Sequence, residues 1–145
     1  MILFIASDHG GFMLKNKLND YLRRKSYDCT DMGCDSTESC DYPDYAEKLC
    51  RQILKMPDSK GILLCGTGIG MSIAANRFPG IRAALCHNSL EARLTRQHND
   101  SNILVLGARI TGDELALDIL DTFLSTSFEG GRHKRRVEML DNLTV

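Results

Sequence analysis

Short apolar segments alternate with longer amphipathic segments along the whole chain. The short segments predict strands at residues 2–6, 27–32, 61–65, 82–86 and 103–106. The longer ones carry apolar side chains at helical spacing and predict helices at residues 12–22, 45–56, 71–77, 89–96 and 112–123. A last helical pattern occupies residues 130–143. This alternation predicts an α/β fold, with a parallel sheet covered by helices on both faces and right-handed crossover connections.

Glycine-rich and polar residues follow three of the predicted strands. They lie at residues 7–11, 65–70 and 107–109. Ligands bind beyond the carboxyl ends of the strands in open parallel sheets, so we expect a site where these segments meet. A further polar run at residues 97–100, between a predicted helix and a strand, could reach the same edge.

The composition fits an ordinary globular protein. The 145 residues, of which 43% are hydrophobic and 26% charged, predict one domain over residues 1–145. The net charge of −1 does not favour nucleic acid or an anionic membrane as a partner, although a basic cluster lies at residues 132–136. The N-terminus lacks the basic region of a signal peptide, and no apolar run reaches the roughly 18 residues of a membrane span. We therefore expect a cytoplasmic protein.

The chain contains six cysteines but no CxxC pair. A domain of this size needs no disulfide, and without an export signal free thiols are expected. Most of these cysteines are interpreted as packing residues. Cys65 differs because it stands at the entrance of the glycine-rich loop at residues 65–70.

The loop does not match either common nucleotide motif. A P-loop requires Gly-Lys-Ser/Thr, whereas Met71 and Ser72 follow here, and the spacing GxGxG is not the GxGxxG of dinucleotide-binding folds. The loop instead predicts backbone N–H groups directed at a negative atom. Such a field would favour the thiolate of Cys65 as a base or nucleophile, with the loop stabilising an oxyanion. Position alone equally allows Cys65 to be a small packing residue.

Other polar residues could complete a site. Asp8 and His9 pair an acceptor with a titratable imidazole, and His98 lies in the polar run. Arg132 and Arg136 share one helix face at a spacing suited to phosphate, and Arg109 could join them. Taken singly, the histidines could be ordinary surface residues and the arginines a solvated basic surface.

With these residues assembled, the chain resembles the type B ribose-5-phosphate isomerases, in the family that includes galactose-6-phosphate isomerase subunits. The matching motifs span nearly the whole chain, and they are SDHGG at 7–11, DYP at 41–43, CGTGIGMSIAAN at 65–76, RLTRQHND at 93–100, GAR at 107–109 and EGGRH with RV at 129–133 and 136–137.

The resemblance implies a Rossmann-like three-layer sandwich with a five-stranded sheet, assembled as a homodimer or a dimer of dimers. It implies interconversion of ribose 5-phosphate and ribulose 5-phosphate, in the non-oxidative pentose phosphate pathway, without a metal or organic cofactor. It also implies a C-terminal helix that reaches a partner subunit.

The resemblance assigns roles to individual residues. Cys65 is implied as the base that moves a proton between C1 and C2, because the family branch that lacks this cysteine takes a glutamate at the position of Met71. His98 is implied to open the sugar ring. The remaining implied residues are Gly66, Thr67, Gly68, Gly70 and Asn99 for the enediolate, His9, Arg109, Arg132 and Arg136 for phosphate, and Asp8 and Tyr42 for sugar hydroxyls.

Two alternatives remain open at this point. The substrate could be a six-carbon sugar phosphate, either allose 6-phosphate or galactose 6-phosphate, because the motifs do not report pocket depth. The protein could also be a non-catalytic phosphosugar-binding or nucleotide-binding protein on the same fold. The second alternative accounts for the glycines and arginines but not for Cys65, Asp8 and His98 together.

Overall fold

Five parallel strands form one sheet in the computed structural model, which describes residues 1–143. The strands are β1 (Ile2–Ser7), β2 (Asp28–Asp31), β3 (Lys60–Cys65), β4 (Ala83–Leu85) and β5 (Ile103–Gly107). Their order across the sheet is β2-β1-β3-β5-β4. Because all five run in the same direction, the loops that follow them emerge at one edge, called here the carboxyl edge.

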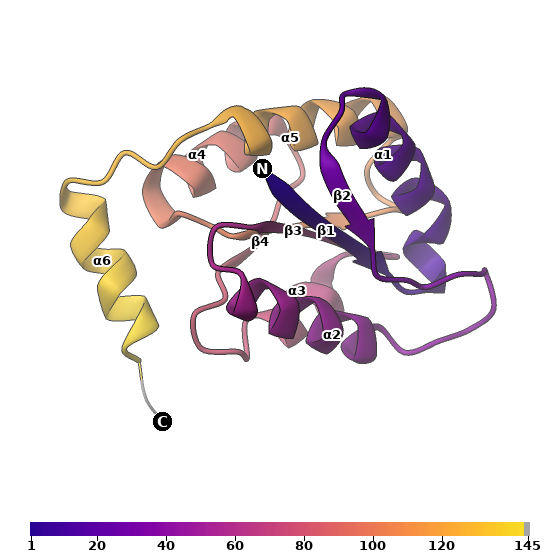
Figure 1. The fold of residues 1–145 in the computed structure, drawn as a ribbon, viewed down its shortest axis with the longest axis horizontal. Helices are drawn as coiled ribbons and strands as arrows, with labels where there is room; N and C mark the ends of the chain where they lie inside the picture. The colour runs from indigo at the N-terminus through magenta and orange to yellow at the C-terminus, as the bar shows by residue number, and fades with distance from the viewer. Residues whose placement is uncertain (144–145) are drawn as a thin grey trace.

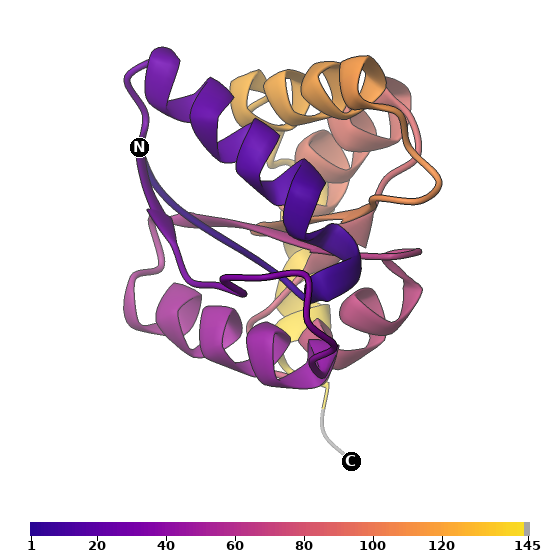
Figure 2. The same cartoon turned by 90° about the vertical axis from the view of Figure 1, so that its right-hand side faces the viewer.

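Helices cover both faces of this sheet, as Figures 1 and 2 show. One layer contains α1 (Phe12–Arg24), α4 (Ser89–Asn99) and α5 (Asp113–Ser125), and the other contains α2 (Tyr42–Lys55) and α3 (Ile69–Ala75). A single 3-10 turn, η1 (His9–Gly11), precedes α1. The last helix, α6 (Arg132–Asp141), lies outside the sandwich, beside α4 (Figure 1).

The strand side chains alternate between two cores. Ile62 and Leu64 pack against the layer of α1, α4 and α5, whereas Leu63 and Cys65 pack against α2 and α3. Both faces of β3 are therefore buried, which is why its sequence is a continuous apolar run. The predicted α/β three-layer sandwich with a five-stranded parallel sheet is confirmed.

Two boundaries differ from the sequence prediction in ways that affect function. Helix α2 begins at Tyr42, because Pro43 suits the first turn of a helix. Helix α4 continues to Asn99, so the polar run at residues 97–100 is the last turn of a helix rather than a loop. The predicted single domain over residues 1–145 stays a prediction, and its last two residues lie outside the described ones.

The C-terminal segment packs less tightly than the sandwich. Gly130 and Gly131 both have positive φ, at 68° and 55°, and turn the chain into α6. Val137 is the buried residue of this helix, while Met139 and Leu140 are 60% and 48% exposed. Within residues 1–143, no helix is long and apolar enough to cross a membrane.

Candidate active site at the carboxyl edge

The loops after β1 and β3 meet where the strand order changes direction. Asp8 N donates to Leu64 O at 3.2 Å, which holds the first loop against β3. A methyl group on Gly10 would lie 3.1 Å from Gly66 N, so this glycine permits the two backbones to approach closely. Such switch points are where open parallel sheets bind ligands.

Cys65 ends β3 at this point and is 5% exposed. Its Sγ accepts a hydrogen bond from Gly68 N at 3.0 Å. Gly68 has φ of +78°, a left-handed conformation that a residue with a side chain rarely adopts. The turn therefore directs a backbone N–H group at the sulfur.

Thr67 forms the exposed part of the same loop. Its Oγ1 accepts from Ile69 N at 3.2 Å. A methyl group on Gly107 would lie 2.4 Å from Thr67 O, so the end of β5 must be glycine for this loop to pack there. Met71, which follows the loop, is fully buried in the core against α2.

Asp8 and His9 follow the end of β1, in the loop that packs against β3. Asp8 is 7% exposed, and its Oδ1 accepts from Gly11 N at 3.2 Å. His9 Nδ1 lies 3.2 Å from both the backbone nitrogen and the backbone oxygen of Cys40. These contacts fix both side chains within the first turn after the strand.

Tyr42 and Arg109 border the loop from two other elements. A methyl group on Gly70 would lie 2.7 Å from Tyr42 Cζ, so the phenol ring packs on the end of the loop. A methyl group on Gly66 would lie 3.0 Å from Arg109 Nη1, and Arg109 N donates to Gly66 O at 2.9 Å. The structure thus brings Asp8, His9, Tyr42 and Arg109 to the Cys65 loop.

The remaining candidates lie elsewhere in the chain. Helix α4 ends at Asn99 and β5 starts at Ile103, so His98 and Asn99 lie at the amino edge of the sheet. The five residues of β5 separate the two edges by roughly 3.3 Å each. The expectation that the polar run could reach the carboxyl edge is therefore wrong for a single chain.

At the amino edge, His98 stacks on His133 of α6. Their ring centroids are 4.3 Å apart and their planes differ by 15°. His133 Nε2 lies 3.6 Å from Glu129 Oε2, and Glu129 N donates to Gln97 O at 3.1 Å. Burial lowers the pKa of His133, and the neighbouring His98 and Arg132 lower it further. We call His98, Glu129 and His133 the amino-edge cluster.

Sequence reasoning did not single out Glu129 or His133 as functional, although both occur in the EGGRH motif. Their separation of four residues was the one sequence signal that their side chains could meet. The stack on His98 could not be read from the sequence, because it joins two helices.

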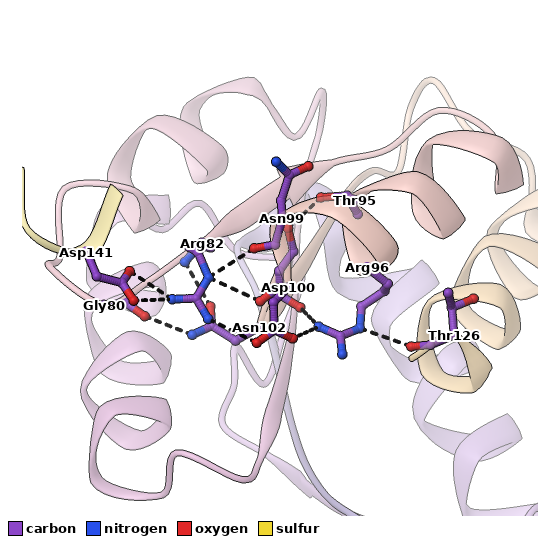
Figure 3. Close-up of polar contacts among 10 residues, drawn as sticks. Gly80, Arg82, Thr95, Arg96, Asn99, Asp100, Asn102, Thr126 and Asp141 are labelled. Carbon is purple, nitrogen blue, oxygen red and sulfur yellow. Dashed lines mark hydrogen bonds and ion pairs between the residues drawn. The ribbon is translucent and has the colours of Figure 1, made fainter. Parts of the chain in front are cut away.

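A second network fastens α6 to the body (Figure 3). Arg82 Nη1 donates to both carboxylate oxygens of Asp141, at 2.8 and 2.9 Å. Arg82 Nε donates to the backbone oxygens of Asn99 and Asp100, at 3.1 and 3.2 Å. The Asn99 side chain points away from Arg82 (Figure 3), while its backbone is held in the network.

Comparison with known proteins gives consistent results. The family model described as Ribose/Galactose Isomerase matches residues 3–140. The chain belongs to this family. It is 46% identical over 133 residues to ribose-5-phosphate isomerase B of Escherichia coli, covering 92% of this chain and 89% of that protein.

Solved structures of the ribose/galactose isomerase family agree with the fold. A ribose 5-phosphate isomerase of Thermotoga maritima superposes with a TM-score of 0.95 at 57% identity, covering 97% of each chain. Ribose-5-phosphate isomerase B of Mycoplasma genitalium with bound ribulose-5-phosphate superposes with a TM-score of 0.93 at 40% identity, covering 96% of this chain and 93% of that one.

In this family member, three other cysteines have environments unlike that of Cys65. Burial raises the pKa of Cys29, Cys50 and Cys86 to about 12, so each stays a neutral thiol near pH 7. Cys50 and Cys86 are 0% and 1% exposed and pack in the cores. Their thiols are therefore poor candidates for proton transfer.

Proposed function

We propose that this protein is an aldose-ketose isomerase that interconverts ribose 5-phosphate and ribulose 5-phosphate. Family membership and the ribulose-5-phosphate bound in the M. genitalium structure support the substrate class. The observation that carries the proposal is the Cys65 sulfur, which accepts the Gly68 N–H at 3.0 Å where the β1 and β3 loops meet. The reaction belongs to the non-oxidative pentose phosphate pathway, which fits a cytoplasmic enzyme.

In the proposed reaction, the Cys65 thiolate takes the proton from C2 of the open-chain aldose. The C1–C2 double bond forms as the carbonyl electrons move to O1, which gives an enediolate. The thiol then returns its proton to C1, O2 becomes the new carbonyl, and a proton moves from O2 to O1. A positioned base of this kind contributes on the order of 10²–10⁴ in rate.

The loop that follows Cys65 would stabilise the enediolate. Gly68 N contacts the sulfur, and Gly66, Thr67 and Gly70 belong to the same loop. One such preorganised donor is worth roughly 10²–10³ in known oxyanion sites. The loop would therefore bind the reacting oxygens rather than the phosphate.

The remaining roles follow the family resemblance. His9 and Arg109 would bind phosphate, and Asp8 and Tyr42 would hold sugar hydroxyls. His98 would open the furanose ring, Asn99 would add a donor for the enediolate, and Arg132 and Arg136 would complete the phosphate site.

We further propose that two chains build each site, in a homodimer or a dimer of dimers. His98 and Asn99 lie at the amino edge of their own sheet, so they meet a Cys65 loop only if it belongs to another chain. Exposed apolar side chains on α6, Met139 and Leu140, favour burial against a second copy. A two-fold axis would generate two equivalent sites.

A coupled isomerase assay tests the proposal. The purified protein alone should convert ribose 5-phosphate faster than allose 6-phosphate or galactose 6-phosphate, and a chelator should leave the rate unchanged because proton transfer by Cys65 requires no metal. A preference for a six-carbon sugar would reassign the substrate. Binding of ribose 5-phosphate without turnover would favour the non-catalytic alternative.

A further inference from the structure

The amino-edge cluster has a donor set that the proposed reaction does not use as a unit. Among residues 1–143, His98, Glu129 and His133 are the group of three potential metal ligands whose donor atoms all lie within 4.8 Å of one another. The isomerase chemistry needs an imidazole at His98, but it gives no role to Glu129 or to the stacked His133.

We propose that His98, Glu129 and His133 form a binding site for a divalent transition-metal ion. Two imidazoles and one carboxylate are a donor set that Zn²⁺ accepts, with a fourth position left for water. Imidazole also suits Ni²⁺ and Cu²⁺. An ion about 2.0–2.1 Å from each donor requires the donors to lie about 3.3 Å apart in a tetrahedral arrangement.

The present geometry meets this requirement in part. His133 Nε2 and Glu129 Oε2 are 3.6 Å apart. The His98 and His133 rings are stacked with their planes 15° apart, so one ring must turn out of the stack before both can point a nitrogen lone pair at the same ion. The Glu129 backbone is held by its bond to Gln97 O, on the residue next to His98, so the ligands come from segments already fastened together.

The electrostatics of the cluster include favourable and opposing groups. The Glu129 carboxylate supplies a negative charge that favours a cation, with Oε2 3.6 Å from His133 Nε2. Arg132 and Arg136 act against a cation here, because both positive side chains belong to the same helix as His133. We therefore expect a site that binds added metal reversibly rather than one that retains it through purification.

The consequence for activity rests on the proposed function. If His98 opens the sugar ring, an ion bound to His98 blocks the lone pair that this step needs. Metal should then inhibit the isomerase, and a chelator should restore the rate. Because His98 is proposed to act at the site of another chain, inhibition would occur at a position remote from Cys65 of the same chain.

The chain contains six thiols, which could compete with the histidines for Zn²⁺. Ni²⁺ is therefore the probe, because imidazole suits it. The chain has four histidines, His9, His87, His98 and His133. Paramagnetic Ni²⁺ titrated into the intact protein should broaden the ring signals of His98 and His133 in NMR spectra before those of the other two. Calorimetry on the same samples gives the affinity.

The chain offers a matched control for the carboxylate. Glu91 and His87 are also four residues apart, with Oε2 and Nδ1 separated by 3.4 Å, but among residues 1–143 they belong to no three-ligand group. Glu129→Gln should weaken Ni²⁺ binding at least tenfold and His133→Asn further, whereas Glu91→Gln should leave it unchanged. Glu129 is half exposed, so its substitution should not disturb folding.

The readouts separate the two proposals. Broadening spread equally over all four histidines, or equal affinity in Glu129→Gln and Glu91→Gln, would overturn the metal site. Selective binding with an unaltered isomerase rate would overturn the inhibitory role alone. A protein without isomerase activity that still binds Ni²⁺ through His98 and His133 would refute the proposed function while supporting the site.

Discussion

The Cys65 loop and the amino-edge cluster lie at opposite edges of one sheet, and different kinds of contact hold them. Around Cys65 the contacts are made mainly by backbone atoms, through Gly68 N, Asp8 N and Arg109 N. In the cluster they are made by side chains, through the His98–His133 stack and the pair of His133 with Glu129.

This difference distinguishes the Cys65 loop, which contacts within one chain hold in place, from the amino-edge cluster, which lies on the outside of the sandwich. Backbone contacts between buried strands fix the Cys65 loop within the monomer, because glycines allow the segments to touch. The cluster depends on α6, which has Val137 as its buried residue and lies outside the sandwich. In the proposed dimer, a second chain would bring its Cys65 loop to these amino-edge residues, whereas one chain already forms the Cys65 loop.

The largest expected effect comes from removing the thiol at the carboxyl edge. Cys65→Ala should lower kcat by about 10³-fold or more, because it removes the base while the loop and the phosphate ligands remain. The measurement is the coupled assay on ribose 5-phosphate, with circular dichroism to verify folding. In the unmodified protein, iodoacetamide should alkylate Cys65 first, and inorganic phosphate should slow that reaction.

Cys50→Ala is the matched control for this substitution. Cys50 is a fully buried residue of α2 that faces α3, with Sγ 3.9 Å from Ala75 O. Its loss should reduce stability by about 1 kcal/mol and leave kcat near that of the original protein. Near-normal turnover by Cys65→Ala would refute the proposed mechanism.

A complementation experiment tests whether the two edges belong to one site. Cys65→Ala and His98→Asn proteins, each inactive alone, are co-expressed with different tags, and the mixed dimer is purified. If each site takes Cys65 from one chain and His98 from the other, one site carries both lesions and the other carries neither. Activity should then return to about half per dimer. No recovery would place both residues in the site of one chain.

The sequence was sufficient for the carboxyl edge because the signals there are local. The strand before Cys65 is a continuous apolar run, so its end and the loop that follows can be located without knowing the rest of the fold. Asp8 and Arg109 follow two other strand ends and share the same edge for the same reason. What the pattern left open was the strand order that places these loops side by side.

The side-chain contacts at the amino edge could not be predicted, because they join segments that are far apart in the sequence. The apolar pattern ends the fourth helix near Arg96, yet α4 continues to Asn99. Arg96 is 5% exposed, and its Nη1 donates to Asp100 Oδ1 at 2.8 Å and Ser101 O at 2.6 Å. These bonds of a buried charged side chain hold the last turn of α4 against the chain that follows it, whereas His98 lies at the amino edge because α4 directly precedes β5. The hydrophobic pattern of the sequence does not indicate these Arg96 hydrogen bonds.

The smallest expected effect concerns the basic face of α6. Arg132→Ala and Arg136→Ala should each raise KM about tenfold and leave kcat nearly unchanged, since a contact with phosphate persists through the reaction. A charge-assisted hydrogen bond of roughly 1.5–3 kcal/mol is consistent with a change of this size.

Lys134→Ala serves as the control for these two arginines. Lys134 lies two residues from each of them, which on a helix of 3.6 residues per turn is nearly the opposite face. The Lys134→Ala substitution removes one positive charge from the same helix. If only the overall positive potential matters, KM should therefore rise equally in all three variants. A selective rise for Arg132 and Arg136 would instead indicate direct phosphate contact by one face of α6. If KM is unchanged in both arginine variants, the two residues belong to the solvated surface, and the phosphate of the substrate must be bound by the carboxyl edge alone.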